Sequence, residues 1–162
     1  MKTAVYAGSF DPPTNGHLWI LKKGLEIFDR ICWSVAVNPK KDYDFSDEER
    51  IAMLGDLAVQ YKNVTIDNCG NKFLVNYAAS VGANYIIRGL RTEEDYNKEY
   101  QMYHQNKNIN IDIETVFVMP PKNLEGISSS FVKSLVGPEG WEEVVKKLVP
   151  ASVFQKMLKK YK

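Results

Sequence analysis

Near its start the chain reads Gly8-Ser9-Phe10-Asp11-Pro12-Pro13-Thr14-Asn15-Gly16-His17. The residues just before this run, 3–7, are mostly small or β-branched, which is typical of a buried strand in a parallel sheet. After it, apolar residues recur every three or four positions, as on one face of a helix: Leu18, Leu21, Leu25 and Phe28. The run is therefore predicted to join a strand to a helix.

A junction of this kind lies at the carboxyl end of a strand, where the N–H groups that begin the helix can bind an anion. Gly8 is predicted to remove a Cβ where the backbone leaves the strand sharply, and Gly16 to do the same beside the helix start. Asp11-Pro12 is predicted to form a turn. The phosphate-loop pattern G-x-x-x-x-G-K-[ST] and the dinucleotide pattern G-x-G-x-x-G are both absent. This argues against a P-loop ATPase and an ordinary dinucleotide oxidoreductase. A plain turn with a capping histidine remains the alternative interpretation of residues 14–17.

Composition limits the classes of protein. The 162 residues are 44% hydrophobic and 25% charged, so we expect one globular domain over residues 1–162. A net charge of +1 argues against nucleic acid as a partner, although a local basic pocket remains compatible with it. Cys32 and Cys69 have neither metal-ligand nor disulfide-framework spacing, which favours a reducing cytoplasm. We expect neither secretion nor a membrane span, since no signal-like segment and no apolar run of about 18 residues is present.

The rest of the chain alternates strands with helices. Strands are predicted at 31–37, 64–66, 85–87 and 113–119, in addition to 3–7. Between them, Ser46 with Glu49 forms a capping-box pattern, Phe73 to Val81 outlines a helix, and Thr92 opens a polar helix reaching about Lys107. This order predicts an α/β fold: a Rossmann-like, doubly wound, five-stranded parallel sheet with helices on both faces and a short C-terminal helical segment.

Right-handed crossovers would place the loops after these strands at one edge of the sheet. The polar residues expected there are Ser9, His17, Lys40, Lys41, Arg88, Arg91, Ser128, Ser129 and Ser130. Taken singly, the serines are an ordinary helix cap, the arginines are surface ion-pair partners, and the lysines are loop residues. Together they supply the hydroxyls, cations and helix-start N–H groups that a triphosphate requires.

The arrangement of these motifs resembles the bacterial phosphopantetheine adenylyltransferases over nearly the whole chain. The resemblance is carried by Gly8 to Pro12, Thr14 to His17, Asn38-Pro39-Lys40-Lys41, Ile87-Arg88-Gly89-Leu90-Arg91 and Ile127-Ser128-Ser129-Ser130. Thr-x-Gly-His with a distal serine run is common to nucleotidylyltransferases, whereas Arg-Gly-Leu-Arg at this distance is more specific. The resemblance implies transfer of the adenylyl group of ATP to 4'-phosphopantetheine, which releases pyrophosphate and gives dephospho-coenzyme A. It also implies Mg²⁺ accompanying ATP, no metal held by protein side chains, and a homohexamer.

The same resemblance assigns roles to residues. His17 and Lys41 are implied to be catalytic, and contacts to 4'-phosphopantetheine fall to Ser9, Lys41, Leu74 and Arg88. The implied ATP contacts are Ser9, Phe10, His17, Gly89, Leu90, Arg91, Glu99, Leu124, Glu125, Gly126, Ile127, Ser128, Ser129 and Ser130. The acceptor phosphate is largely ionised near pH 7, because its second pKa is about 6, so no general base is needed. Catalysis then consists of alignment and stabilisation of charge.

Two positions depart from the family pattern. Ser9 stands where threonine is more common, and Leu124 stands where an aromatic residue is frequent, which predicts weaker stacking on adenine. His104, on the polar helix, is expected to be structural or solvent-facing. Two other functions stay open: a sister transferase that adenylylates nicotinamide mononucleotide or uses CTP, and a non-catalytic nucleotide-binding module. Lys41 and Arg88 favour phosphopantetheine, and pyrophosphate release separates catalysis from binding alone.

Overall fold

The computed structural model describes residues 1–162, whose five strands form one parallel sheet in the order β3-β2-β1-β4-β5. The strands are β1 (Thr3–Gly8), β2 (Arg30–Ala36), β3 (Val64–Gly70), β4 (Tyr85–Gly89) and β5 (Glu114–Val118). The sheet confirms the predicted Rossmann-like, doubly wound arrangement.

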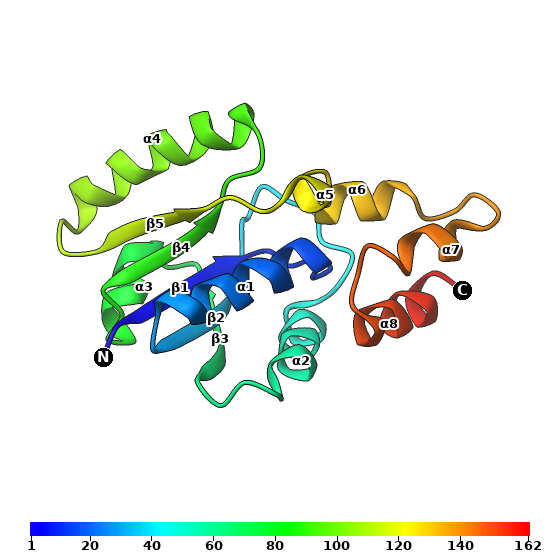
Figure 1. Cartoon of the computed structure of the whole chain (residues 1–162), viewed down its shortest axis with the longest axis horizontal. Helices are drawn as coiled ribbons and strands as arrows, with labels where there is room; N and C mark the ends of the chain where they lie inside the picture. Colours follow the sequence, from blue (N-terminus) through cyan, green and yellow to red (C-terminus); the bar gives the residue numbers. More distant parts are fainter.

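Eight helices connect and follow the strands. They are α1 (Asn15–Ile27), α2 (Asp47–Ala58), α3 (Leu74–Ser80), α4 (Glu93–Ile109), α5 (Lys122–Glu125), α6 (Ser129–Ser134), α7 (Trp141–Val145) and α8 (Ala151–Tyr161). Helices α5 to α8 extend past one end of the sheet, on the side towards which β1 points (Figure 1). They include the short C-terminal helices that the sequence predicted.

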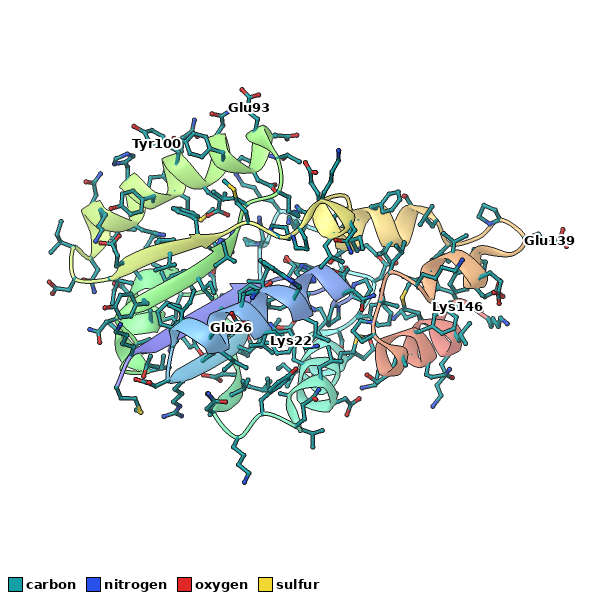
Figure 2. The ribbon with its side chains drawn as sticks, viewed as in Figure 1. Lys22, Glu26, Glu93, Tyr100, Glu139 and Lys146 are labelled. Atoms are coloured by element: carbon teal, nitrogen blue, oxygen red, sulfur yellow. The ribbon has the colours of Figure 1, made fainter.

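The alternation of side chains along β1 builds a separate apolar layer on each face of the sheet. Ala4 and Tyr6 belong to the larger cluster, which packs under α1, α2, α7 and α8. Val5 and Ala7 belong to the smaller cluster on the opposite face, under α3. Figure 1 shows α1 and α3 on opposite sides of the strands. The outward face of α1 carries exposed charges such as Glu26 (Figure 2).

The strand order reverses between β1 and β4. From β1 the chain winds outwards to β2 and β3, then returns to the other side of β1 to form β4 and β5. At such a switch point the loops after neighbouring strands turn to opposite faces and leave a crevice between them. The loop after β1 runs into α1 through Thr14-Asn15-Gly16-His17, and β4 runs into the loop after it through Arg88-Gly89-Leu90-Arg91.

Local capping signals were predicted correctly. Ser46 caps α2 in a capping box with Glu49, and Thr92 caps α4 by accepting the Asp95 N–H. The predicted first residue of one helix was wrong. Helix α3 begins at Leu74, and Phe73 is two-thirds exposed rather than part of the buried face. The third strand is also longer than predicted, because pairing with β2 continues to Gly70 and buries Cys69 within it.

Both cysteines are buried free thiols. None of the eight helices combines the length and the apolar character that crossing a lipid bilayer requires.

Candidate active site

Thr14 and His17 close the start of α1 by a pair of reciprocal hydrogen bonds. The Thr14 hydroxyl accepts the His17 N–H, and the His17 Nδ1 accepts the Thr14 N–H at 3.0 Å. This is a capping box in which histidine occupies the position that glutamate or glutamine usually takes. Because Nδ1 acts as an acceptor, the neutral ring carries its proton on Nε2. The cap therefore leaves Nε2–H as a donor on the other edge of the imidazole.

The surroundings of His17 keep its imidazole neutral. Burial and the nearby guanidinium groups of Arg91 and Arg88 lower the pKa of His17 to about 3. The ring of Phe10 meets the imidazole edge-on, with centroids 5.0 Å apart. Phe10 itself is buried and has a left-handed backbone with φ of 49°, which its packing against Tyr6 and Trp33 stabilises. A fixed, neutral N–H group is suited to donating a hydrogen bond to a phosphate oxygen. It is poorly suited to accepting a proton as a general base.

The low pKa of His17 predicts a pH dependence of stability. Above pH 6.5 the ring is unprotonated in both the folded and the unfolded chain, so it contributes nothing. Between pH 6.5 and about 3 the unfolded chain binds a proton that the native state does not, so the free energy of unfolding falls as pH falls. The slope of this contribution approaches about 1.4 kcal/mol per pH unit. Urea unfolding from pH 7 to 4 should show a shallower fall for His17→Asn, and parallel curves would contradict the assignment.

Gly8 and Gly16 are required for close packing rather than for an unusual backbone, since neither has a positive φ. This agrees with the prediction that the two ends of the loop need residues without a Cβ, and packing is the reason. A Cβ on Gly16 would lie 3.3 Å from the Ile127 carbonyl oxygen, and one on Gly8 would lie 3.0 Å from the Phe10 ring. Gly16 therefore allows the segment from Leu124 to Ile127 to lie directly against the start of α1.

Arg88 lies at the end of β4, half-buried, with three of its N–H groups in use. Its Nη1 donates to the carbonyl of Ala7 at 2.9 Å, while Nε and Nη2 donate to the same carboxylate oxygen of Glu99. A guanidinium has five N–H groups, so two remain for a ligand. Glu99 was predicted to contact ATP, and the structure places its carboxylate against Arg88. The pair fixes the guanidinium plane at the switch point between β1 and β4.

Arg91 connects the loop after β4 with the segment before α6. It forms an ion pair with Asp95 in the first turn of α4, and its Nη1 lies 3.5 Å from the Ile127 carbonyl oxygen. Leu90, Arg91 and Glu125, all predicted to contact ATP, line one hollow of about 530 Å³. Met119 and Lys122 line it too, and no sequence pattern had singled them out.

The three serines have different contacts. Ser128 caps α6 by accepting the Phe131 N–H at 3.0 Å, and Ser129 donates its hydroxyl hydrogen to the Pro12 carbonyl at 2.8 Å. Ser130 is exposed and its hydroxyl has no hydrogen-bond partner within the chain. The predicted helix cap is thus the work of Ser128, whereas Ser129 ties α6 to the loop after β1.

These contacts separate the effects of single serine substitutions. Ser128→Ala should lower the free energy of unfolding by about 1 kcal/mol, because the Phe131 N–H loses its acceptor. Ser130→Ala is the matched control and should change it by less than about 0.5 kcal/mol. Urea unfolding measures both, with turnover recorded alongside. Turnover should change little in either variant, and a hundredfold loss would show that the hydroxyl acts directly on the substrate.

The remaining predicted residues lie around this edge. Lys41 is exposed on the loop after β2, and its ammonium group has no hydrogen-bond or ion-pair partner. Ser9 is half-buried with a free hydroxyl. Leu74 starts α3 and packs against the smaller apolar cluster, on the face of the sheet opposite to α1. Gly126 is exposed at the end of α5, while Leu124 packs against the larger cluster.

His104 is exposed and stacks edge-on against Tyr100, which agrees with the expected structural or solvent-facing role. Together with Glu99 and the tyrosines of α4, it lines a second hollow of about 410 Å³.

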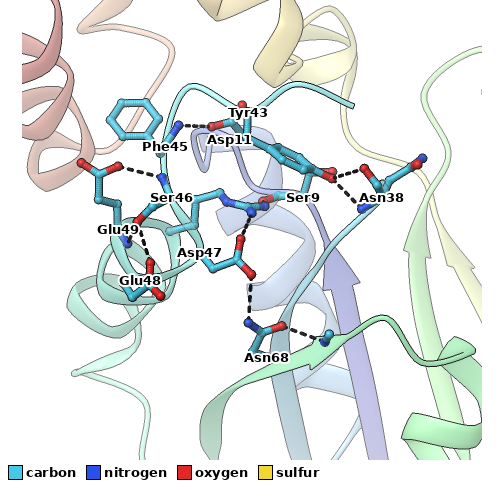
Figure 3. Close-up of polar contacts among 12 residues, drawn as sticks. Ser9, Asp11, Asn38, Tyr43, Phe45, Ser46, Asp47, Glu48, Glu49 and Asn68 are labelled. Atoms are coloured by element: carbon cyan, nitrogen blue, oxygen red, sulfur yellow. Dashed lines mark hydrogen bonds and ion pairs between the residues drawn. The ribbon is translucent and has the colours of Figure 1, made fainter. Parts of the chain in front are cut away.

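A partly buried polar network, which the sequence did not reveal, supports these loops. Asp11, predicted as a turn residue, accepts the N–H group of Phe45 (Figure 3). It also accepts the N–H group of Asp44 and, at 2.7 Å, the ammonium of Lys133. Lys133 also binds Asp44, to which Tyr161 donates. Burial acts to raise the pKa of Asp44, but the hydrogen bonds from Lys133 and Tyr161 outweigh it and lower the pKa. The network joins the loops after β1 and β2 to α6 and α8.

Comparison with solved structures supports the fold. The chain superposes on nicotinic acid mononucleotide adenylyltransferase of Plasmodium falciparum complexed with NaAD, with a TM-score of 0.70 over 98% of this chain and 96% of the other. The two sequences are only 16% identical, so this likeness concerns architecture alone.

Sequence comparison is more specific. Residues 5–135 match the Cytidylyltransferase-like family model. Phosphopantetheine adenylyltransferase of Chromobacterium violaceum is 48% identical over 99% of this chain and 98% of its own length. The enzyme of the same name from Alkaliphilus metalliredigens is 41% identical over 99% of each chain. The His17 cap, the Arg88 fork and the serine-capped α6 thus occur in a chain that belongs to the phosphopantetheine adenylyltransferase family of cytidylyltransferase-like proteins.

Proposed function

We propose that this protein transfers the adenylyl group of ATP to 4'-phosphopantetheine and releases pyrophosphate and dephospho-coenzyme A. The observation that carries the proposal is the junction of β1 and α1. There a neutral imidazole presents Nε2–H, and two guanidinium groups lie close enough to lower its pKa. Membership of the family supplies the identity of the two substrates.

The reaction requires one displacement at phosphorus. An oxygen of the acceptor phosphate attacks the α-phosphorus of ATP, and the bond from that phosphorus to the bridging oxygen of the β-phosphate breaks. The electron pair of that bond leaves with pyrophosphate. His17 Nε2–H would donate to a non-bridging oxygen of the α-phosphate, where negative charge grows. The acceptor phosphate is already an anion near pH 7, so the site needs no proton acceptor.

The other residues would hold the two substrates in line. The two unused N–H groups of Arg88 form a fork that matches two oxygens of the acceptor phosphate. Lys41 is a mobile point charge on an exposed loop and would approach both reacting phosphates, together with the Ser9 hydroxyl. The hollow lined by Leu90 and Arg91 would receive the nucleoside.

Magnesium would arrive with the substrate. No group of three or more histidine, cysteine, aspartate or glutamate side chains in the chain is arranged to hold a metal ion. We assign no step to the metal. Its proposed place is on the phosphate oxygens of ATP.

Pyrophosphate release measured with several acceptors tests the proposal. Wild-type protein with MgATP should release pyrophosphate with 4'-phosphopantetheine, and not with pantetheine, which lacks the attacking phosphate. Release with nicotinamide mononucleotide instead, or a requirement for CTP, would identify a sister transferase. ATP binding by calorimetry with no release from any acceptor would identify a non-catalytic binding module.

The proposal includes a homohexamer in the cytoplasm. The free buried thiols suit a reducing compartment. Large apolar side chains are exposed along α4, along the edge strand β5 and just after it: Tyr96, Tyr100, Ile109, Phe117 and Met119. Helix α4 has no buried residue. Figure 2 shows Tyr100 on the outer edge that α4 forms. Such a patch beside an open strand edge is a natural contact between copies. Sedimentation should give six times the 18.5 kDa mass of one chain.

A further inference from the structure

We infer that Arg50 is a positioning residue for the reaction. It holds the Ser9 backbone and the loop of residues 37–46, called here the Lys41 loop, in a fixed position relative to each other. This inference rests on the proposed adenylyl transfer, in which both segments approach the reacting phosphates. Arg50 lies in α2, whose first turn follows the Lys41 loop.

The Arg50 side chain is fully buried and reaches the loop after β1. Its Nη1 donates to the Ser9 carbonyl at 2.7 Å, and its Nη2 binds Asp47 Oδ1. The other oxygen of Asp47 accepts from Asn68 at the end of β3. One guanidinium thus joins the segment that follows β1 to the start of α2 and, through Asp47, to β3.

The same guanidinium also fixes the loop that carries Lys41. It lies over the ring of Tyr43, with its central carbon 4.1 Å from the ring centroid, in cation–π contact. The Tyr43 hydroxyl accepts the Asn38 N–H at 2.7 Å and lies 3.3 Å from the Asn38 carbonyl oxygen. Figure 3 shows Ser9, Tyr43 and Asp47 gathered together, with Asn38 bonded to Tyr43. Tyr43 therefore closes the Lys41 loop on itself, and Arg50 holds Tyr43.

The stability of the fold does not by itself explain why an arginine occupies position 50. Burial of an ion pair is costly, and apolar residues of similar volume often replace one without loss of stability. Arg50 even leaves its buried Nε without a partner. On α2 it lies on the same face as Met53 and Leu54, which are both buried in the larger apolar cluster. What arginine adds over an apolar residue is a planar group that contacts Ser9, Asp47 and Tyr43 at once.

The main test is Arg50→Lys in the pyrophosphate-release assay. Lysine keeps the charge but, as a point charge, cannot bond Ser9 and Asp47 while covering Tyr43. Misplacement of reacting groups by about 1 Å costs up to about a hundredfold in rate. We expect kcat to fall by roughly ten- to a hundredfold, with the Kd for ATP measured without acceptor changed less than about threefold. If the kcat of Arg50→Lys stayed within about twofold of the wild-type value, the inference would be overturned.

A double-variant cycle separates positioning from mere loss of stability. If Arg50 acts through the Lys41 loop, adding Arg50→Lys to Lys41→Ala should lower kcat by less than about threefold more, whereas independent effects would multiply and overturn the inference. Val145→Ala, a buried truncation on α7, is the matched control: it should lower the thermal midpoint and leave kcat unchanged. An equal kcat loss in this control would also overturn the inference.

Tyr43→Phe is the alternative test of the inference if the Arg50→Lys variant does not fold. It keeps the ring under Arg50 but releases Asn38, and it should lower kcat with the same coupling to Lys41→Ala; no effect on kcat contradicts the inference. Failure of the proposed function is distinguishable, because wild-type protein would then release no pyrophosphate with 4'-phosphopantetheine. If another acceptor is used, the same cycle measured with that acceptor decides about Arg50.

Discussion

His17→Ala should lower kcat by about 10²–10³, equivalent to roughly 2.7–4 kcal/mol, while the Kd for ATP stays near its wild-type value. The reason is that Nε2–H would be aimed at an oxygen whose negative charge increases in the transition state, so the contact gains most of its strength there. The ring is neutral and held by the Thr14 N–H, so no reorganisation precedes this donation. Steady-state kinetics and ATP calorimetry without acceptor measure the two effects separately.

His17→Asn is the matched control for the cap. The asparagine Oδ1 occupies the same place along the side chain as Nδ1 and can still accept the Thr14 N–H, but nothing reaches the position of Nε2. The alanine variant also loses about 1 kcal/mol of stability with the cap. We expect His17→Asn to restore that stability and to remain as slow as His17→Ala. Near-normal turnover in the alanine variant, or turnover restored by asparagine, would show that His17 only caps α1.

Arg88→Ala should weaken binding of 4'-phosphopantetheine by about 2–5 kcal/mol, or roughly thirtyfold to several thousandfold, which is the usual cost of truncating one partner of a buried charge pair. Lys41→Ala should instead lower kcat with a smaller effect on acceptor binding, because its free ammonium can follow charge as the new bond forms. Calorimetry with each substrate, together with turnover, distinguishes the two variants.

Arg88→Ala should also lower the stability of the fold, because the carboxylate of Glu99 loses its ion-pair partner. The double variant Arg88→Ala/Glu99→Gln removes that stranded charge. It should recover stability but not acceptor affinity. Loss of ATP affinity with normal acceptor binding in Arg88→Ala would show that the acceptor pocket lies elsewhere, and a different acceptor would then be favoured.

The sequence predicted those features that depend on near neighbours in the chain. Ser46, Thr92 and Ser128 cap helices through residues three positions away, so their patterns are complete in the sequence. The parallel sheet follows from the alternation of strands and helices, and with it the common edge at which Ser9, His17, Arg88 and Arg91 lie.

Features that depend on distant partners escaped prediction. Asp11 reads as a turn residue because its partner Lys133 lies 122 positions away, and Glu99 gives no sign of its pairing with Arg88. In the loop after β1 the left-handed backbone is at Phe10 rather than at Gly8 or Gly16, since aromatic packing offsets its strain. Arg50 did leave a signal: an arginine three and four residues before the buried Met53 and Leu54 lies on an apolar helix face, where a charge needs an explanation.

The cap of α1 also limits how this protein can change over time. Glutamate at position 17 would form the same capping box with Thr14 and add a negative charge at the positive end of the helix dipole, so selection or redesign for heat resistance alone would favour it. That exchange would put an acceptor in place of the donor that is proposed to face the nucleotide. Improvement of the helix and preservation of the chemistry therefore compete for one side chain. Thermostable descendants would then have to gain their stability elsewhere in the chain.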